Sequence, residues 1–168
     1  MDILEVVERG CTISDFIVKF VDLPRFYPYC QSCKNYGKLW SCPPFERSPL
    51  SDLSEFKNVT FVLLRVSPAT NSAYLQGRSL LDGRLLEMEQ AKAGSIAFFG
   101  GSCQICIQSK CAREEGGECR FPDRSRLSLE VLGVDVARVL KELFGVNLTW
   151  NEGESEGDAY SLLGALFH

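Results

Sequence analysis

Residues 95–106 are SIAFFGGSCQIC, a short apolar run that passes through two glycines into a pair of cysteines. The apolar run is typical of a buried strand, and the two glycines are typical of a tight turn. Earlier in the chain, the apolar run DFIVKFV at residues 15–21 also precedes a cysteine-rich stretch. The sequence therefore predicts that strands lead into two cysteine-bearing loops, and the rest of the fold depends on how those strands are arranged.

Hydrophobic periodicity predicts alternating strands and helices along the rest of the chain. The predicted strands cover residues 15–21, 59–66, 95–99, 146–150 and 159–167, and an acidic loop at 151–158 joins the last two. The predicted helices cover residues 2–9, a segment that begins at Ser48-Pro49, and residues 72–93, 127–132 and 135–144. Two stretches, 24–48 and 102–125, have no regular period and contain most of the cysteines.

This alternation predicts an α/β fold, with a single domain over residues 1–168. We expect a mixed, partly parallel sheet of about five strands, flanked by helices. If the strands that precede the two cysteine stretches are parallel, both loops leave the sheet at the same carboxyl edge, where α/β domains bind ligands. The two metal-binding loops would then be neighbours.

The composition is that of a globular protein that needs no disulfides to stabilise its core. The chain has 168 residues, of which 45% are hydrophobic and 24% charged, and its net charge of −4 argues against nucleic-acid binding. The longest apolar run, at residues 61–64, is too short to span a membrane, and residues 1–5 lack the pattern of a signal peptide. We therefore expect a cytoplasmic protein without nucleic-acid or membrane partners.

Eight cysteines are unusual in a cytoplasmic chain, because thiols stay reduced there and a dense cysteine pattern then indicates metal or redox chemistry. Seven of them form two sets, and each set begins with two cysteines that are separated by two residues. This spacing lets one turn of backbone direct both sulfur atoms at one metal centre. The first set is Cys30, Cys33 and Cys42, and the second is Cys103, Cys106, Cys111 and Cys119.

The spacing favours an iron–sulfur cluster over zinc but leaves both open. A structural zinc site takes four ligands, which the Cys30/Cys33 and Cys103/Cys106 pairs could supply, but the other three cysteines would then have no role. A 4Fe–4S cluster takes a local run of cysteines, and the four at 103–119 satisfy it unaided. The three at 30–42 are one ligand short of a second cluster.

The remaining candidate ligands are few. The only histidine is His168, which we expect at a frayed chain end, so any internal site is dominated by thiolates and histidine-dependent catalysis is excluded. Cys11 lies far from both sets, and we interpret it as a small buried apolar residue.

The charges near the cysteines suit an anionic metal–thiolate centre. Residues 25–47 carry a net charge of +3 and residues 103–126 a net charge of +1, although the whole chain is acidic. Nearby cations offset the negative charge of thiolates, but a solvated loop or a docking face for an acidic partner would have the same pattern. Aromatic residues that could shield a cluster from water crowd the first loop: Phe26, Tyr27, Tyr29, Tyr36, Trp40 and Phe45.

Two segments resemble the "predicted metal-binding protein" family, whose members are cysteine-rich domains of unknown function from anaerobic bacteria and archaea. The first segment is CQSCKNYG at 30–37 followed by WSCPP at 40–44. The second is GSCQIC at 101–106, Cys111, CRFPD at 119–123, RLSLE at 126–130 and GVDV at 133–136. The chain departs from the family at 129–131, where it has LEV and the family tends to have MEA. The resemblance implies metal binding in an anaerobic redox setting and specifies no reaction.

Three functions fit these observations. The first is a small iron–sulfur protein that transfers electrons to a redox partner protein, with one or two 4Fe–4S clusters. The second is an enzyme in which the three-cysteine set leaves one iron open to a small ligand, for ligand-transfer or desulfuration chemistry, with Ser41, Lys38 or Arg120 as polar neighbours. The third is an interaction domain with structural zinc.

Overall fold

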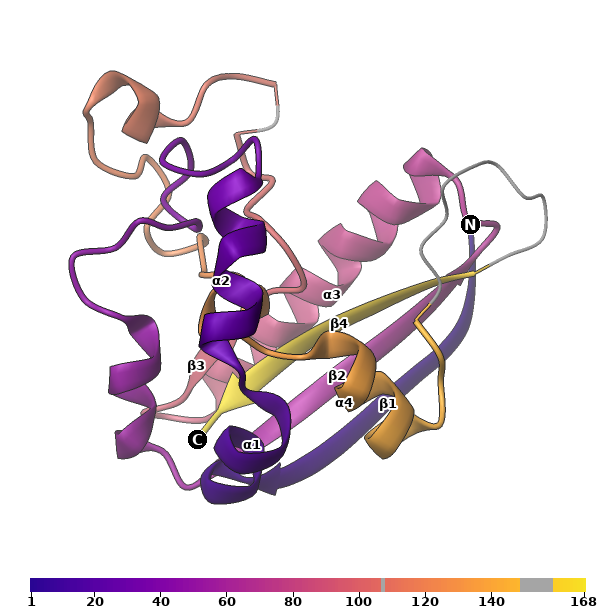
Figure 1. Cartoon of the computed structure of the whole chain (residues 1–168). Helices are drawn as coiled ribbons and strands as arrows, with labels where there is room; N and C mark the ends of the chain where they lie inside the picture. Colours follow the sequence, from indigo (N-terminus) through magenta and orange to yellow (C-terminus); the bar gives the residue numbers. More distant parts are fainter. Residues whose placement is uncertain (107, 149–158) are drawn as a thin grey trace.

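The computed structural model describes residues 1–106, 108–148 and 159–168 (Figure 1). Four strands form one sheet in the order β1-β2-β4-β3, and every neighbouring pair is antiparallel. The strands are β1 (Asp2–Thr12), β2 (Asn58–Ser67), β3 (Ile96–Phe98) and β4 (Tyr160–Phe167). The predicted α/β class is confirmed, but the prediction of a partly parallel sheet of about five strands is wrong for the described residues.

The sheet separates two apolar cores, because alternate side chains of a strand point to opposite faces. On one face Phe61 and Leu63 of β2 pack with α1 (Ile13–Phe20) and α4 (Val136–Phe144). On the other face Val62 and Leu64 pack against α3 (Asn71–Ala91). Figure 1 shows α3 on one side of the sheet and α1 and α4 on the other. Within the described part of the chain, none of the helices combines the length and the apolar character that crossing a membrane requires.

Five of the predicted elements are confirmed. The strands expected at 59–66, 95–99 and 159–167 are β2, β3 and β4, and the helices expected at 72–93 and 135–144 are α3 and α4. Asp135 begins α4 as predicted, since its carboxylate accepts a hydrogen bond from Arg138 N at 3.0 Å. The segment that begins at Ser48 is a 3-10 helix, η1 (Pro49–Glu55), and residues 127–132 contain a shorter one, η3 (Leu129–Leu132).

The predicted helix at 2–9 is wrong, because these residues lie in β1. A β-bulge between Ile3 and Glu5 shifts the register by one residue, so that Ile3 faces Val66 and Val6 faces Leu64. Two apolar residues three positions apart therefore point to the same face of a strand, a spacing that otherwise indicates a helix.

The predicted strand at 15–21 is also wrong, because these residues lie mostly in α1. The buried side chains Ile13, Phe16 and Phe20 recur at helical spacing. Thr12 caps the helix by accepting a hydrogen bond from Asp15 N at 3.1 Å. The β-branched run at 17–18 suggested a strand, but the packing of Phe16 and Phe20 determines the outcome.

Three smaller expectations also need correction. The irregular stretch at 24–48 begins inside a helix, α2 (Leu23–Ser32), which contains Pro28. None of its residues is buried, so its apolar residues show no helical periodicity in the sequence. Residues 146–148 of the strand predicted at 146–150 are not in a strand, and the rest of it lies outside the described residues, as does the loop at 151–158. The chain end is not frayed, because His168 exchanges backbone hydrogen bonds with Asn58 and its ring contacts Thr60 Oγ1 at 2.9 Å.

Candidate metal centre

The two cysteine stretches lie against each other at one end of the molecule, at the top left of Figure 1. The first stretch begins inside helix α2, which contains Cys30 and is capped at its C-terminal end by Cys33, and the second follows strand β3. The predicted proximity of the two loops is confirmed, but the predicted cause is wrong, because the sheet is antiparallel and the first cysteine stretch begins in a helix and not after a strand. Contacts between the loops themselves hold them together.

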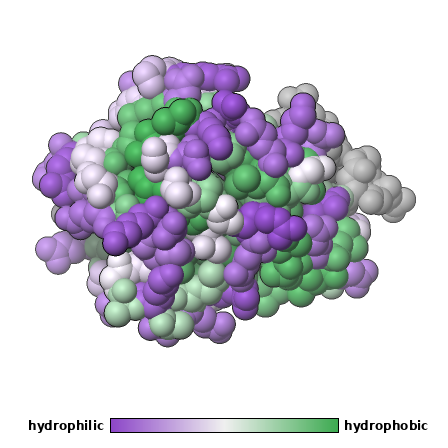
Figure 2. Space-filling model, turned by 90° about the horizontal axis from the view of Figure 1, so that it is seen from below, coloured by the Kyte–Doolittle hydropathy of each residue, from purple (hydrophilic) through white to green (hydrophobic). Residues whose placement is uncertain are grey.

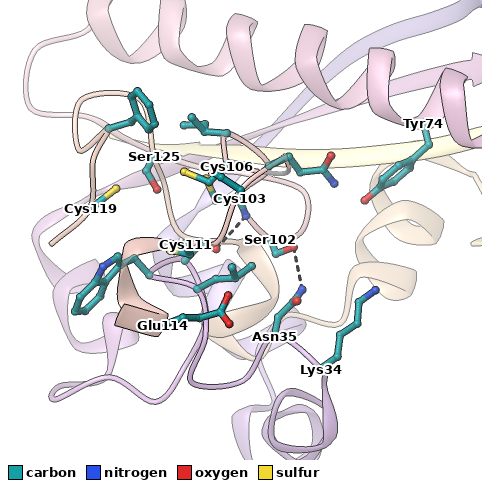
Figure 3. A pocket seen from close by; sticks show the side chains of 17 residues that line it. Lys34, Asn35, Tyr74, Ser102, Cys103, Cys106, Cys111, Glu114, Cys119 and Ser125 are labelled. Atoms are coloured by element: carbon teal, nitrogen blue, oxygen red, sulfur yellow. Dashed lines mark hydrogen bonds between the residues drawn. The ribbon is translucent and has the colours of Figure 1, made fainter. Parts of the chain in front are cut away.

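Two of these contacts involve the residues that begin the second set. Cys103 N donates a hydrogen bond to Ser41 Oγ at 2.9 Å, and Asn35 Nδ2 donates to Ser102 Oγ at 3.2 Å (Figure 3). Ser41 is buried, and its hydroxyl also lies 3.7 Å from the sulfur of Cys42. A single serine therefore links the last cysteine of the first set to the first cysteine of the second.

Arg113, between Cys111 and Cys119, provides the most extensive contact. Its guanidinium donates hydrogen bonds to three carbonyl oxygens of the first loop, those of Leu39, Cys42 and Pro44, at 2.8, 2.5 and 2.5 Å. The same group lies 5.0 Å from the ring centre of Trp40, a cation–π distance. Trp40 Nε1 in turn donates to Gly117 O at 3.0 Å, so that each loop holds the other.

All four cysteines of the second set line one cavity of about 450 Å³. Figure 3 shows Cys103, Cys106, Cys111 and Cys119 around it, with Ser102, Asn35 and Glu114. Trp40 and Leu39 of the first loop close part of the cavity wall, as an apolar shield would. The sequence prediction that these four cysteines belong together is consistent with this arrangement.

The three cysteines of the first set differ in exposure: Cys33 is exposed, Cys30 is half-buried and Cys42 is buried. Burial raises the pKa of the Cys30 thiol, and the negative charges of Glu130 and Cys33 raise it further. Burial also raises the pKa of Cys42, against the lowering effect of the Ser41 hydrogen bond, and Cys33, Cys30 and Glu130 add to the rise. The negative charges of Cys33 and Glu130 therefore act on the thiols of both Cys30 and Cys42.

Glu130 is a site residue to which the sequence assigned no chemical role. It lies in η3, and its carboxylate accepts a hydrogen bond from Gly101 N at 3.1 Å, next to the second cysteine set. Burial raises the pKa of this carboxyl. Glu130 appeared in the sequence only as part of the family resemblance, and nothing in its neighbours indicated that it would contact Gly101.

Arg78 is a second residue that sequence reasoning missed. Its side chain is 1% exposed, forms an ion pair with Asp82 at 3.3 Å and donates to Ser102 O at 3.2 Å. Gly101 has a positive φ of 105°, and a Cβ there would lie 2.8 Å from Arg78 Nη1. The signal that could have revealed Arg78 is its i,i+4 spacing to Asp82 on a helix with apolar neighbours.

The polar neighbours proposed from the sequence lie in different places. Ser41 is at the junction of the two loops, as described above. Arg120 is engaged elsewhere, since it donates to Lys110 O at 2.8 Å and to Glu115 at 3.0 Å. Lys38 is exposed. Cys11 packs against the core at β1 as an apolar residue would, but it is half-buried and not buried as expected.

The chemistry of the donors fits a thiolate-bound metal. All eight cysteines are free, so no disulfide competes for the sulfur atoms, and thiolates are the ligands that zinc and iron–sulfur clusters prefer. In residues 1–106, 108–148 and 159–168, no three His, Cys, Asp or Glu side chains are grouped closely enough to hold a metal ion. The assignment of the seven cysteines as ligands stays a prediction.

The comparison with known proteins agrees with this donor set. No curated protein and no solved structure is significantly similar to the chain. A family model does match, over residues 19–167, and its description is "Predicted metal-binding protein (DUF2284)". The matched region contains both cysteine loops and most of the chain. The chain therefore belongs to this family of predicted metal-binding proteins.

Proposed function

We propose that this protein binds a 4Fe–4S cluster through Cys103, Cys106, Cys111 and Cys119 and transfers electrons to a redox partner protein. The observation that carries the proposal is the single cavity that all four thiols line. A cluster bound there would supply one-electron redox chemistry at a potential tuned by burial and nearby charge. We place this function in the cytoplasm, where thiols stay reduced.

The chain's own residues would support such a cluster in two ways. Trp40 and Leu39 in the cavity wall limit access of water, which lowers the local dielectric constant. The guanidinium of Arg113 holds the first loop against the second and brings a positive charge to a site that would carry excess negative charge. The cavity would therefore be both shielded and partly neutralised by the chain itself.

The test is to purify the protein anaerobically and to measure iron, acid-labile sulfide and the paramagnetic resonance spectrum after reduction. We expect brown protein with at least four irons and four sulfides per chain, as the proposed cluster formula requires. Cys106→Ser should lose this cluster, whereas Cys11→Ser is the matched control and should keep it. Colourless protein with stoichiometric zinc would contradict the proposal and support a structural zinc site.

A second candidate function follows from the first cysteine set. Cys30, Cys33 and Cys42 provide three thiols, the hydroxyl of Ser41 lies 3.7 Å from the sulfur of Cys42, and the charge of Glu130 acts on Cys30 and Cys42. A centre bound by three cysteines has one free coordination position, which would suit an enzyme that binds a small ligand at iron, for ligand-transfer or desulfuration chemistry. Polar groups next to a buried thiol favour such a role.

Spectra separate the two functions. An electron carrier should show the same visible and resonance spectra with and without small ligands such as cyanide or sulfide. An enzyme with an open iron should show a ligand-dependent change that disappears in Cys42→Ser but persists in Cys11→Ser. A change that survives in Cys42→Ser would rule out the first set as the ligand site.

A further inference from the structure

Strand β1 forms one edge of the sheet, and among the described residues it pairs only with β2. It is eleven residues long, which is long for an edge strand. An edge of this length presents a row of backbone N–H and C=O groups that can pair with another strand. β1 also precedes the residues that the family model matches, so an inference about it does not follow from family membership.

Apolar side chains are exposed along this edge. Ile3, Leu4 and Val6 of β1 are 53%, 54% and 48% exposed, and Leu80 of α3 is 48% exposed. Arg84, one helical turn after Leu80, reaches Glu8 of β1 at 2.7 Å, so α3 lies alongside the same stretch of strand. Figure 2, which views the molecule from below, shows apolar residues gathered among charged ones on this underside.

We infer that β1 pairs with β1 of a second copy of this chain, antiparallel, about a two-fold axis. Such pairing joins the two four-stranded sheets into one continuous sheet. If the regular part of each strand pairs about an axis at Val7, the middle residue of β1, Val7 faces Val7 and Val6 of one copy faces Glu8 of the other. Centring the pairing on the middle of the strand therefore defines one register.

Charge supports this register. It places Glu5 of each copy opposite Arg9 of the other, so the symmetry creates two attractive cross-strand pairs. Shifting the register by one or two residues in either direction removes both pairs, and two of these shifts bring glutamates face to face. Residues 5–9 all lie beyond the bulge, which leaves their pairing regular. On the other face of the sheet, Val6 of one copy lies diagonally across from Val6 of the second.

The experiment is sedimentation equilibrium on the full chain with charge-reversal variants. We expect the unmodified chain to have a mass near twice the 18.8 kDa of one chain. Arg9→Glu and Glu5→Lys each create like-charged pairs, and each should weaken dimerisation at least about tenfold. A one-to-one mixture of the two variants should recover dimers, because Glu5 of the first variant then faces Arg9 of the second, and the two new charges face each other.

Lys141→Glu, an exposed charge reversal on α4, is the matched control and should leave the dimer intact. Circular dichroism of each variant checks that it folds, and recovery in the mixture separates a lost contact from a misfolded chain. A monomeric unmodified chain would overturn the inference. So would a dimer that Arg9→Glu leaves unchanged, because the two copies would then meet through another surface.

Discussion

Arg113 shows how one side chain can organise a site formed by two loops. Hydrogen bonds from a charged group to carbonyl oxygens contribute more to stability than neutral ones, and Arg113 forms three of them across the loop interface. We predict that Arg113→Gln lowers the free energy of unfolding by about 1–3 kcal/mol, as measured by urea unfolding of the metal-free protein.

Lys110→Gln is the matched control for Arg113→Gln, because Lys110 is an exposed cation in the same loop. Its substitution should change stability by less than about 0.5 kcal/mol. Arg113→Lys keeps the charge but lacks the planar fork, so it should behave more like the glutamine variant than like the unmodified protein. Full stability in Arg113→Lys would show that charge alone, without the forked geometry, holds the loops.

Glu89, near the end of α3, gives the stability a pH dependence. Its carboxylate accepts hydrogen bonds from Arg126 Nε, at 2.9 Å, from Arg126 Nη2, and from Ala97 N at 2.5 Å. Burial acts to raise the pKa of Glu89, but the bonds from Arg126 and Ala97 outweigh it, so the pKa lies below its ordinary value. A carboxyl with a lowered folded pKa stabilises the fold above its unfolded pKa, about 4.3, and this stabilisation is lost as the pH falls through the folded pKa.

We therefore predict that Glu89→Gln is less stable than the unmodified protein by about 1–3 kcal/mol at pH 7. The difference should narrow as the pH falls below about 4, because the glutamate itself then becomes neutral. Urea unfolding at a series of pH values measures both the stability difference at pH 7 and its decrease at low pH. Glu87→Gln, an exposed glutamate on the same helix, is the control. A difference that stays constant down to pH 3 would contradict the assignment to this carboxylate.

At the scale of elements, helix α3 contains two glycines with opposite surroundings. A Cβ on Gly77 would lie 2.8 Å from Leu162 Cδ1 and 3.2 Å from Val66 Cγ1, whereas a Cβ on Gly83 would meet nothing within 4 Å. Alanine in a helix is favoured over glycine by about 1 kcal/mol. We predict that Gly83→Ala raises the free energy of unfolding by about 0.5–1 kcal/mol, whereas Gly77→Ala lowers it by about 1–2 kcal/mol through overpacking.

Each variant serves as the control for the other, because both make the same chemical change in the same helix. Thermal unfolding monitored by circular dichroism shows directly whether each variant is more or less stable than the unmodified protein. If both variants were stabilised, α3 could not lie as close to β2 and β4 at Gly77 as described. The close approach also explains why a glycine, which weakens a helix in isolation, occupies position 77 of α3.

The balance between local sequence preference and tertiary packing also decided which elements could be predicted from the sequence. α4 and β2 were predictable, since a cap and a helical period mark α4 and a continuous apolar run marks the central strand β2. β1 and α1 were not. A bulge gave β1 a helical spacing, and the β-branched residues of α1 hid the period of Phe16 and Phe20. Both errors concern residues 2–20, where the local sequence pattern was weak and packing on β2 determined the secondary structure.

The candidate site was partly predictable for a related reason. Cysteine spacing is a local property, so the two sets could be identified from the sequence, and the second set does line one cavity. The long-range partners could not be identified, because nothing near Arg113, Arg78 or Glu130 in the sequence indicates which loop each would contact. Their contacts form in a fold whose sheet is entirely antiparallel, whereas we expected a mixed, partly parallel sheet.

At the scale of the whole molecule, the second cysteine loop is closed at its base. Phe99 N donates to Leu127 O at 2.9 Å, and Leu129 N donates to Phe99 O at 2.8 Å, so residues 99 and 127–129 pair where the loop leaves and rejoins the sheet. Both apolar cores lie on the sheet side of this closure, with Leu129, Val131 and Leu132 as the first core residues after the loop. The loop can therefore become ordered or disordered without exposing either core.

This closure predicts how metal loading, if it occurs as proposed, changes the molecule. Hydrogen exchange of the metal-free and reconstituted protein, followed by mass spectrometry, should show strong added protection in residues 100–126 and 33–45 on loading, because Arg113 and Ser41 join the two loops. Peptides from β2 and β4 should exchange at nearly the same rate in both forms. Arg113→Gln should confine the added protection to residues 100–126. Equal changes in the sheet and the loops would show that the metal centre and the core fold as one cooperative unit.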